Sequence, residues 1–333
     1  MVRSRSQGLR VRGLFMTGER RIPKALKRMI GFLKHLLVAT DGSKSGDRAV
    51  SFAIELARKQ RSDVSICYAV DRTGVEIESF ASTEETSRRS LRLARALDAA
   101  AESILAEAAK RATHAGIVVA TAALEYPPAP AIAAFARARI VDAIVMGTQG
   151  KRGFERAVMG SVAGSVLRRA SVPTFVVPSQ WSDAHLVFDR ILVAIDDSDP
   201  SDAAAAFARS FVEADGARLV FCTVIKTREF LDTDTSASDA MSNAVRLLAM
   251  QTDRARDNGV VFESVVAEGE PADAILSMAA MLDSNLIIVG THGRRGLNRL
   301  FVGSVAERIV CCCRVPVVVV PASNATTLRS PEL

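Results

Sequence analysis

The stretch Gly147-Thr148-Gln149-Gly150, completed after nine intervening residues by Gly160-Ser161, has a second copy in Gly290-Thr291-His292-Gly293 with Gly303-Ser304. Each copy follows a short apolar, strand-like run and precedes a predicted helix. Glycines at the corners of a strand-to-helix connection let backbone N–H groups and the positive helix N-terminus converge on an anion. The repeated stretch therefore predicts a phosphate-binding loop in each half of the chain.

A structural interpretation of the same glycines is also open. They would then serve only tight turns and close helix packing, which is a common reason for glycine at such positions. A lone glycine pattern is weak evidence for a ligand, whereas two copies in equivalent places strengthen the phosphate interpretation.

Strands and helices alternate around both copies, and the second half of the chain repeats the plan of the first. The predicted strands span 35–40, 63–70, 117–124, 143–146 and 173–178, then a strand from 190, 217–224, 260–267, 286–289 and 316–321. The predicted helices span 46–60, about 82–114, 129–139 and 162–169, then 239–258, 271–281 and 305–313. Alternation of this kind predicts parallel sheets with right-handed crossovers. We therefore expect an α/β fold of two tandem doubly wound, five-stranded, Rossmann-like domains.

The length of 333 residues is enough for two domains of ordinary size. We predict the following segments: a basic flexible N-terminal extension over 1–33, a first domain over 34–178, a linker over 179–188, a second domain over 189–322 and a tail over 323–333.

The net charge of +6 is concentrated at one end of the chain. Residues 1–34 hold ten Lys or Arg and one Glu, whereas the rest holds 33 basic and 36 acidic residues. Because the body is slightly acidic and aromatic residues make up only 5%, specific nucleic-acid binding is not expected. No apolar run approaches the length of a membrane span. Five cysteines without a disulfide-framework pattern indicate a reducing compartment, and we expect a cytoplasmic protein.

An acidic residue follows the first strand of each half. Asp41 and Asp196 are these residues, and the glycine loops follow the fourth strands. Ligands of open doubly wound sheets bind outside the carboxyl ends of the strands, where the winding reverses. If the first and fourth strands are neighbours, each acid and each loop share one crevice, with the acid suited to a ribose or base edge. The alternative role of each Asp is a turn or helix N-cap residue.

The sequence resembles two universal stress protein domains in tandem. The resemblance rests on Val38-Ala-Thr-Asp41-Gly-Ser and Val193-Ala-Ile-Asp196-Asp-Ser, the two glycine loops, and closing Val-Pro segments that end at Pro178 and Pro321. It covers residues 34–322, and the full glycine pattern is that of the family's ATP-binding branch. It implies the adenine nucleotide alpha hydrolase-like version of the fold, with the two halves forming an internal pseudo-dimer.

The resemblance also implies a set of ATP-binding residues and, with the nucleotide, Mg²⁺; no catalytic residue and no protein metal ligand is implied. In the first half the implied residues are Ala39, Asp41, Val70, Gly147, Gly150, Arg152, Gly160 and Ser161. In the second half they are Asp196, Val224, Gly290, Gly293, Arg295, Gly303 and Ser304.

Two positions depart from symmetry between the halves. Asp197 stands where the first half has Gly42, which places a second carboxylate near the expected site. We expect it to weaken binding of ATP alone or to favour a divalent cation. Tyr126 stands opposite Gly269, and its effect on the first site is left open.

These observations favour a cytoplasmic, ATP-binding stress-response regulator or sensor. A slow ATPase or self-phosphorylating enzyme is the first alternative, although the chain has no Gly-x4-Gly-Lys-Ser/Thr loop and no evident pair of base and nucleophile. A nucleotide-independent interaction module is the second. The expected partners are an adenine nucleotide and an unidentified protein, with a homodimer of the whole chain as a further option.

Overall fold

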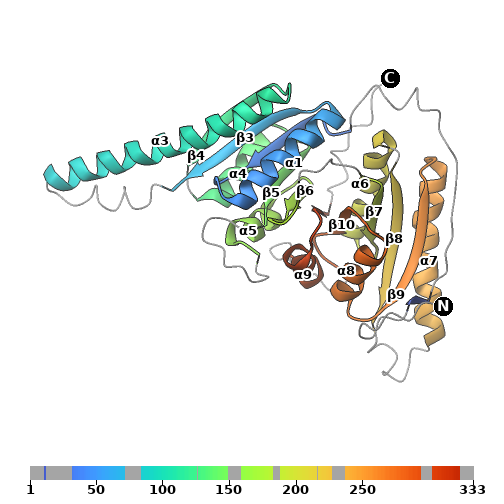
Figure 1. Ribbon diagram of the computed structural model, residues 1–333. Helices are drawn as coiled ribbons and strands as arrows, with labels where there is room; N and C mark the ends of the chain where they lie inside the picture. Colours follow the sequence, from blue (N-terminus) through green and yellow to red (C-terminus); the bar gives the residue numbers. More distant parts are fainter. Residues whose placement is uncertain are drawn as a thin grey trace. The chain divides into compact units, whose positions relative to one another are not determined.

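The computed structural model, shown in Figure 1, forms two compact units. The first unit comprises residues 33–186, and the second comprises residues 187–333 together with 1–32. The structure describes residues 11–12, 32–71, 84–125, 127–148, 159–182, 188–215, 217–226, 237–293 and 302–322.

The first unit is a five-stranded parallel sheet in the order β6-β5-β2-β3-β4. Its strands are β2 (His35–Ala39), β3 (Asp63–Val70), β4 (Val119–Glu125), β5 (Ala143–Gly147) and β6 (Thr174–Val177). Its helices are α1 (Lys44–Gln60), α3 (Glu84–His114), α4 (Pro128–Ala138) and α5 (Ser161–Arg169). The order reverses direction between β2 and β5, so right-handed crossovers place α1 and α3 on one face and α4 and α5 on the other.

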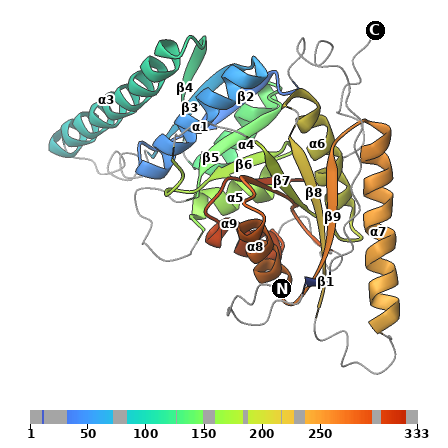
Figure 2. The ribbon, with the colours of Figure 1, turned by 45° about the vertical axis from the view of Figure 1, so that its right-hand side comes forward.

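The second unit repeats this sheet as β9-β8-β7-β10-β11, again parallel, with one added edge strand. Its strands are β7 (Arg190–Ala194), β8 (Arg218–Ile225), β9 (Phe262–Glu268), β10 (Leu286–Gly290) and β11 (Val317–Val320). Its helices are α6 (Asp199–Asp215), α7 (Ala237–Asp257), α8 (Pro271–Met281) and α9 (Ser304–Cys312). Figure 2 shows α7 running alongside β9. The expected fold class is confirmed for each unit.

Helix boundaries follow local signals in the sequence. Ser43 caps α1 by accepting a hydrogen bond from the Gly46 N–H group, and Arg61 ends the helix in the left-handed conformation. Pro128 and Pro271 occupy the first turn of α4 and α8, where a missing N–H group costs nothing.

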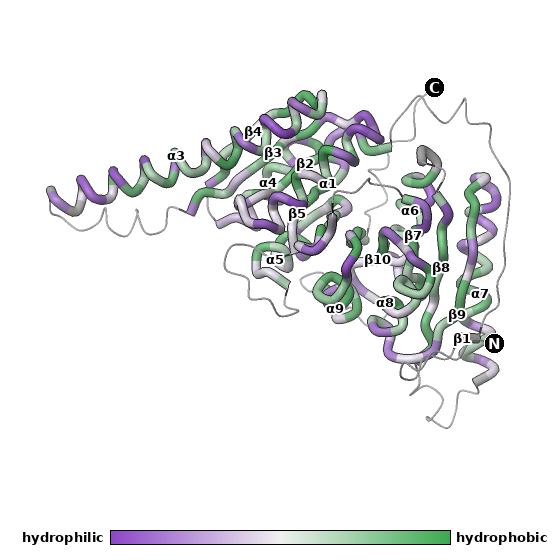
Figure 3. The backbone as a smooth tube through the Cα atoms, in the orientation of Figure 1, coloured by the Kyte–Doolittle hydropathy of each residue, from purple (hydrophilic) through white to green (hydrophobic). Residues whose placement is uncertain are grey.

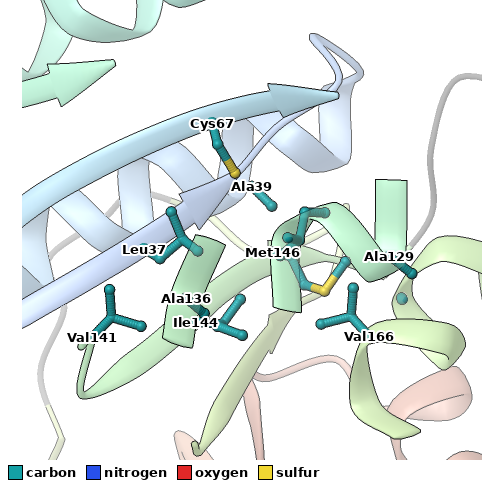
Figure 4. Packing of buried hydrophobic residues seen from close by; sticks show 11 residues of the cluster. Leu37, Ala39, Cys67, Ala129, Ala136, Val141, Ile144, Met146 and Val166 are labelled. Carbon is teal, nitrogen blue, oxygen red and sulfur yellow. The ribbon is translucent and has the colours of Figure 1, made fainter. Parts of the chain in front are cut away.

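The core of the first unit lies between the sheet and its helices. Hydrophobic residues dominate the buried strands, which Figure 3 shows in green. On the face covered by α4 and α5, Leu37 and Ile144 from the strands pack with Ile132, Ala136 and Val166 from the helices (Figure 4). This packing fixes the strand ends that carry the predicted site.

Aromatic residues at the ends of the two units pack against other rings of the same unit. The ring of Trp181 packs edge-on against Phe52 of the first unit, with 5.4 Å between the ring centroids. In the second unit, the ring centroids of Phe188 and Phe211 are 5.2 Å apart, and those of Phe32 and Phe207 are 5.5 Å apart.

One feature was not indicated by the sequence pattern. The added edge strand of the second unit is β1 (Val11–Arg12), which pairs antiparallel with β9. The long helix expected over about 82–114 is confirmed as α3, whose 31 residues are ten more than the 21 of its counterpart α7. Within the described part of the chain, no helix is both long enough and apolar enough to cross a bilayer.

Candidate functional site

The first and fourth strands of each half are neighbours, as the crevice hypothesis requires. In the first unit, β2 pairs with β5 so that Ala39 lies opposite Met146, which brings Asp41 and Gly147 to the same carboxyl edge. In the second unit, β7 pairs with β10, with Val193 opposite Ile288. The predicted acid and the predicted loop therefore start from adjacent strand ends in both units.

The two valines of the predicted set lie at the ends of the neighbouring strands. Val70 is the last residue of β3 and is buried, whereas Val224 is the penultimate residue of β8 and is half-buried. Ala39 ends β2 and is also buried. Each of these residues lies at the carboxyl edge of the sheet in its own unit.

The first glycine of each loop is required by helix packing. A Cβ atom on Gly147 would lie 2.2 Å from the Ser45 hydroxyl oxygen and 2.7 Å from the Ser45 carbonyl carbon. A Cβ atom on Gly290 would lie 2.6 Å from the carbonyl carbon of Pro200. Since backbone atoms cannot yield at such distances, the structural interpretation accounts for these two glycines.

Backbone hydrogen bonds close each loop at its base. Gly160 donates its N–H to the Thr148 carbonyl oxygen at 2.9 Å, and Gly303 donates to the Thr291 carbonyl oxygen at 2.7 Å. Thr148 donates in turn to Val177, and Thr291 donates to the Val320 carbonyl oxygen. The start of α5 and the start of α9 are thereby held beside the strand ends.

Helix α5 presents an N-terminus suited to an anion. Its N-cap is Gly160, with φ −58° and ψ 142°, and no side chain caps the helix. Its first turn contains no acidic residue. The first N–H groups of a helix have no partner within the helix and carry partial positive charge. Helix α9 also follows a glycine, Gly303, but it carries Glu307 in its first turn.

The turn after β2 uses one oxygen of Asp41. Ser43 donates its N–H to the Asp41 Oδ1 atom at 3.0 Å, and Gly42, with φ 69°, provides the left-handed backbone of this turn. Burial raises the pKa of the Tyr68 hydroxyl, and the negative charges of Asp41 and Asp71 raise it further. Tyr68 therefore lies in the electrostatic field of Asp41, at a position that the sequence did not single out.

The turn after β7 reaches the glycine loop directly. The Ser198 hydroxyl hydrogen-bonds to Asp196 Oδ1, and the same Ser198 oxygen lies 3.3 Å from the His292 carbonyl oxygen. A Cβ atom on Gly293 would lie 2.7 Å from Asp196 Oδ2. The structure thus brings Asp196 and Gly293 together, and Gly293 is needed for this approach.

The backbone of this turn differs from that of the first unit. Among the described non-glycine residues only Arg61, Ile140 and Asp283 have a positive φ, so Asp197 does not reproduce the left-handed turn of Gly42. The backbone conformation at Asp197 therefore differs from that at Gly42.

An acidic hollow of about 90 Å³ lies beside this second turn, between the start of α6 and the helix α7. Its lining residues are Asp196, Asp197, Ser198, Asp199, Asp202, Leu247, Met250 and Gln251. Gln251 is buried; its amide donates to Asp202 at 2.6 Å and its carbonyl oxygen accepts from Arg209 at 2.8 Å. Sequence reasoning missed the contribution of α7, because this contact joins residues 49 positions apart in the chain.

Several predicted residues lie outside the described part of the chain. They are Gly150, Arg152 and Arg295, together with Tyr126. Ser161 and Ser304 are the first residues of α5 and α9. Within the described ranges, no group of three or more His, Cys, Asp or Glu side chains could hold a metal ion.

Comparison with known proteins gives consistent results over nearly the whole chain. The family model described as the universal stress protein family matches residues 33–178 and again residues 188–321. A universal stress protein of Mycobacterium tuberculosis (strain ATCC 25618 / H37Rv) is 31% identical over 188 residues, which cover 54% of this chain and 61% of that protein. One of Methanocaldococcus jannaschii is 33% identical over 144 residues, covering 43% of this chain and 81% of that protein.

A solved structure has the same fold. A universal stress protein from Archaeoglobus fulgidus DSM 4304 superposes with a TM-score of 0.66 at 22% identity, covering 88% of this chain and 98% of that one. A protein of unknown function from Pseudomonas aeruginosa PAO1 superposes with a TM-score of 0.59 at 16% identity, covering 90% and 95% of the two chains.

Proposed function

The chain belongs to the universal stress protein family, and from this we propose that it is a stress-response regulator or sensor that binds ATP at the carboxyl edges of its sheets. The observation that carries the proposal is the open N-terminus of α5, which Gly160 holds beside the end of β5 through its hydrogen bond to Thr148. This arrangement supports phosphate binding by backbone N–H groups.

In this proposal the first unit provides the stronger site. The adenine ring packs against Ala39 and Val70, and the Asp41 carboxylate, whose Oδ1 atom accepts from the Ser43 N–H, also accepts from a ribose hydroxyl. The phosphates face the start of α5, whose first turn is free of acidic residues. The loop residues Gly150 and Arg152 complete the proposed phosphate contacts.

The second unit provides the weaker site. Its loop and helix repeat the hydrogen bonds of the first, which supports binding. Its phosphate region, however, faces Glu307 in the first turn of α9, and Asp197 lies at the adjacent turn. Like charges near a polyanion weaken its binding. We therefore propose that this site fills only at higher ATP concentration or with Mg²⁺ on the phosphates.

The proposed role is regulatory and cytoplasmic, with nucleotide occupancy changing the conformation or the partner of the protein. Beside the second loop, the Ser198 hydroxyl bonds to the Asp196 carboxylate, and the Thr291 hydroxyl oxygen lies 3.0 Å from His292 Nδ1. Slow ATP hydrolysis therefore stays the alternative that the experiment below distinguishes.

The nucleotide content of gently purified protein tests this proposal. The protein is denatured, and the released ATP, ADP and AMP are quantified per chain. About one ATP per chain supports a strong first site and a weak second site, and ADP in its place indicates turnover. Protein that holds no nucleotide and takes up no added ATP with Mg²⁺ would refute the proposal and favour the nucleotide-independent module.

A further inference from the structure

The outer edge of β4 in the first unit is an unprotected sheet edge. In the described part of the chain, β4 pairs with β3 on one side only and ends the sheet order. The pairing with β3 is regular from Val119 to Glu125, without a bulge. Unpaired edges present free N–H and C=O groups that can pair with another strand.

The sequence of β4 contains few of the features that usually block edge pairing. Its one charged residue is Glu125 at the end of the strand, and residues 118–124 include no charged residue and no proline. The side chains of Ala120, Thr121 and Ala123 are exposed, and that of Val118 is 86% exposed. Lysine, proline and bulges are the devices by which proteins protect such edges. Among the described residues, the edge of β4 is therefore uncharged over 118–124, regular and open to pairing.

The equivalent edge in the second unit is covered by a strand. β9 holds the same place in its sheet as β4, and β1 pairs with it antiparallel, with Val11 opposite Ala267 and Arg12 opposite Val266. This position of the fold therefore accepts an added antiparallel strand within this same chain. The β1 segment occupies the edge of β9, so in the described structure β4 is left for another partner.

We propose that β4 is a homodimerisation strand, which pairs antiparallel with β4 of a second copy of this chain. A two-fold axis through Thr121 would place Ala120 opposite Ala122 and Val118 opposite Leu124 of the partner copy, so small and apolar side chains meet. The nearest charge, Glu125, would face Ile117 and not its own copy. Symmetric pairing needs one self-complementary strand, and β4 meets this requirement.

Sedimentation of the full chain over a concentration series tests the proposal. We expect wild-type protein to dimerise reversibly and Thr121→Lys to remain monomeric, because two lysines would face each other across the axis. Ala96→Lys adds the same charge at an exposed position of α3 and should dimerise like wild type. A mixture of Thr121→Lys and Thr121→Glu should recover the dimer. Monomeric wild type throughout the series, or a Thr121→Lys dimer as strong as wild type, would overturn the proposal.

Hydrogen exchange on wild-type protein gives a second test that does not depend on the folding of a variant. Protection of the amides in 118–124 should rise with protein concentration, while that of β9 should stay constant. A dimer whose β4 amides exchange as fast as those of the monomer would contradict pairing at this edge.

Discussion

Gly147 lies against Ser45 so closely that an added Cβ atom would be 2.2 Å from the Ser45 hydroxyl oxygen and 2.8 Å from its carbonyl oxygen. The first glycine of the loop therefore holds the end of β5 against the start of α1. Gly160, at the far end of the same loop, has an ordinary backbone conformation and begins α5. Folding and ligand binding can thus be tested at different glycines of one motif.

Gly147→Ala should destabilise the first unit by about 1–3 kcal/mol, because backbone atoms of α1 would have to move. Urea unfolding measures the change. Gly164→Ala in α5 is the matched control, since its Cβ would meet only flexible side-chain ends, those of Met159 at 2.8 Å and Arg168 at 3.5 Å, and alanine favours a helix. Equal free energies of unfolding for the two variants would show that the contact with Ser45 does not restrict the side chain at position 147.

Gly160→Asp and Gly160→Asn separate charge from shape at the proposed phosphate site. Both residues are good N-caps, so we expect α5 to remain as stable as in wild type. The aspartate should weaken ATP binding by about tenfold or more relative to the asparagine, since its carboxylate would repel the phosphates. Calorimetric titration with ATP measures the difference. Equal affinity of the two variants would mean that the phosphates do not approach α5.

The elements were predictable because their signals are local. The strand expected over 63–70 and the helix expected over 271–281 have those bounds in the structure. The helix expected from Gly46 begins at Lys44, because Ser43 acts as its N-cap. The adjacency of the strand ends also followed from the sequence, since alternating strands and helices allow few topologies.

The remaining features depend on contacts between distant residues. β1 consists of two residues in a basic segment, and only its partner β9 makes it a strand. The approach of Ser198 to His292 joins residues 94 positions apart. No periodicity or spacing could show that Gly147 serves helix packing, because the reason lies in the backbone of Ser45.

Cys67 and Cys222 should resist alkylation in the folded protein. Burial raises the pKa of each thiol from 9.0 to about 12, so the reactive thiolate is scarce at neutral pH. Cys312 is exposed. Treatment with iodoacetamide and peptide mass spectrometry should find Cys312 modified first. Labelling of Cys67 as fast as Cys312 in folded protein would contradict this assignment.

The same two thiols should make the protein less stable in alkali. Their pKa is raised on folding, so the folded state keeps a proton that the unfolded state loses above about pH 9. The stabilisation is complete below pH 9 and is lost as the pH rises towards 12. Between pH 8 and pH 10 we expect a loss of roughly 1 kcal/mol for each thiol. Urea unfolding of wild type and of the Cys67→Ala, Cys222→Ala double variant should show a smaller pH dependence in the variant.

Asp197→Asn should strengthen ATP binding at the second site. The Asp197 side chain lines a hollow with three other aspartates. Each of these carboxylates would repel the phosphates of a nucleotide bound there. Asparagine removes one charge and keeps the shape, whereas glycine would also change the backbone of the turn. We expect an increase in affinity of about three- to tenfold, which is the effect of roughly 1 kcal/mol from one partly solvated charge.

This measurement needs a weakened first site, so both proteins carry Gly160→Asp, and the two sites are fitted as separate binding steps. Asp257→Asn, at the exposed end of α7, removes the same charge away from the hollow and should leave the affinity unchanged. The gain from Asp197→Asn should shrink in high salt, because the screening length falls from about 10 Å at 0.1 M to about 3 Å at 1 M. A gain that persists unchanged in high salt would point to altered backbone geometry, and no gain at low salt would place the phosphates away from Asp197. Only a salt-sensitive gain fits a carboxylate that limits nucleotide binding in the second unit.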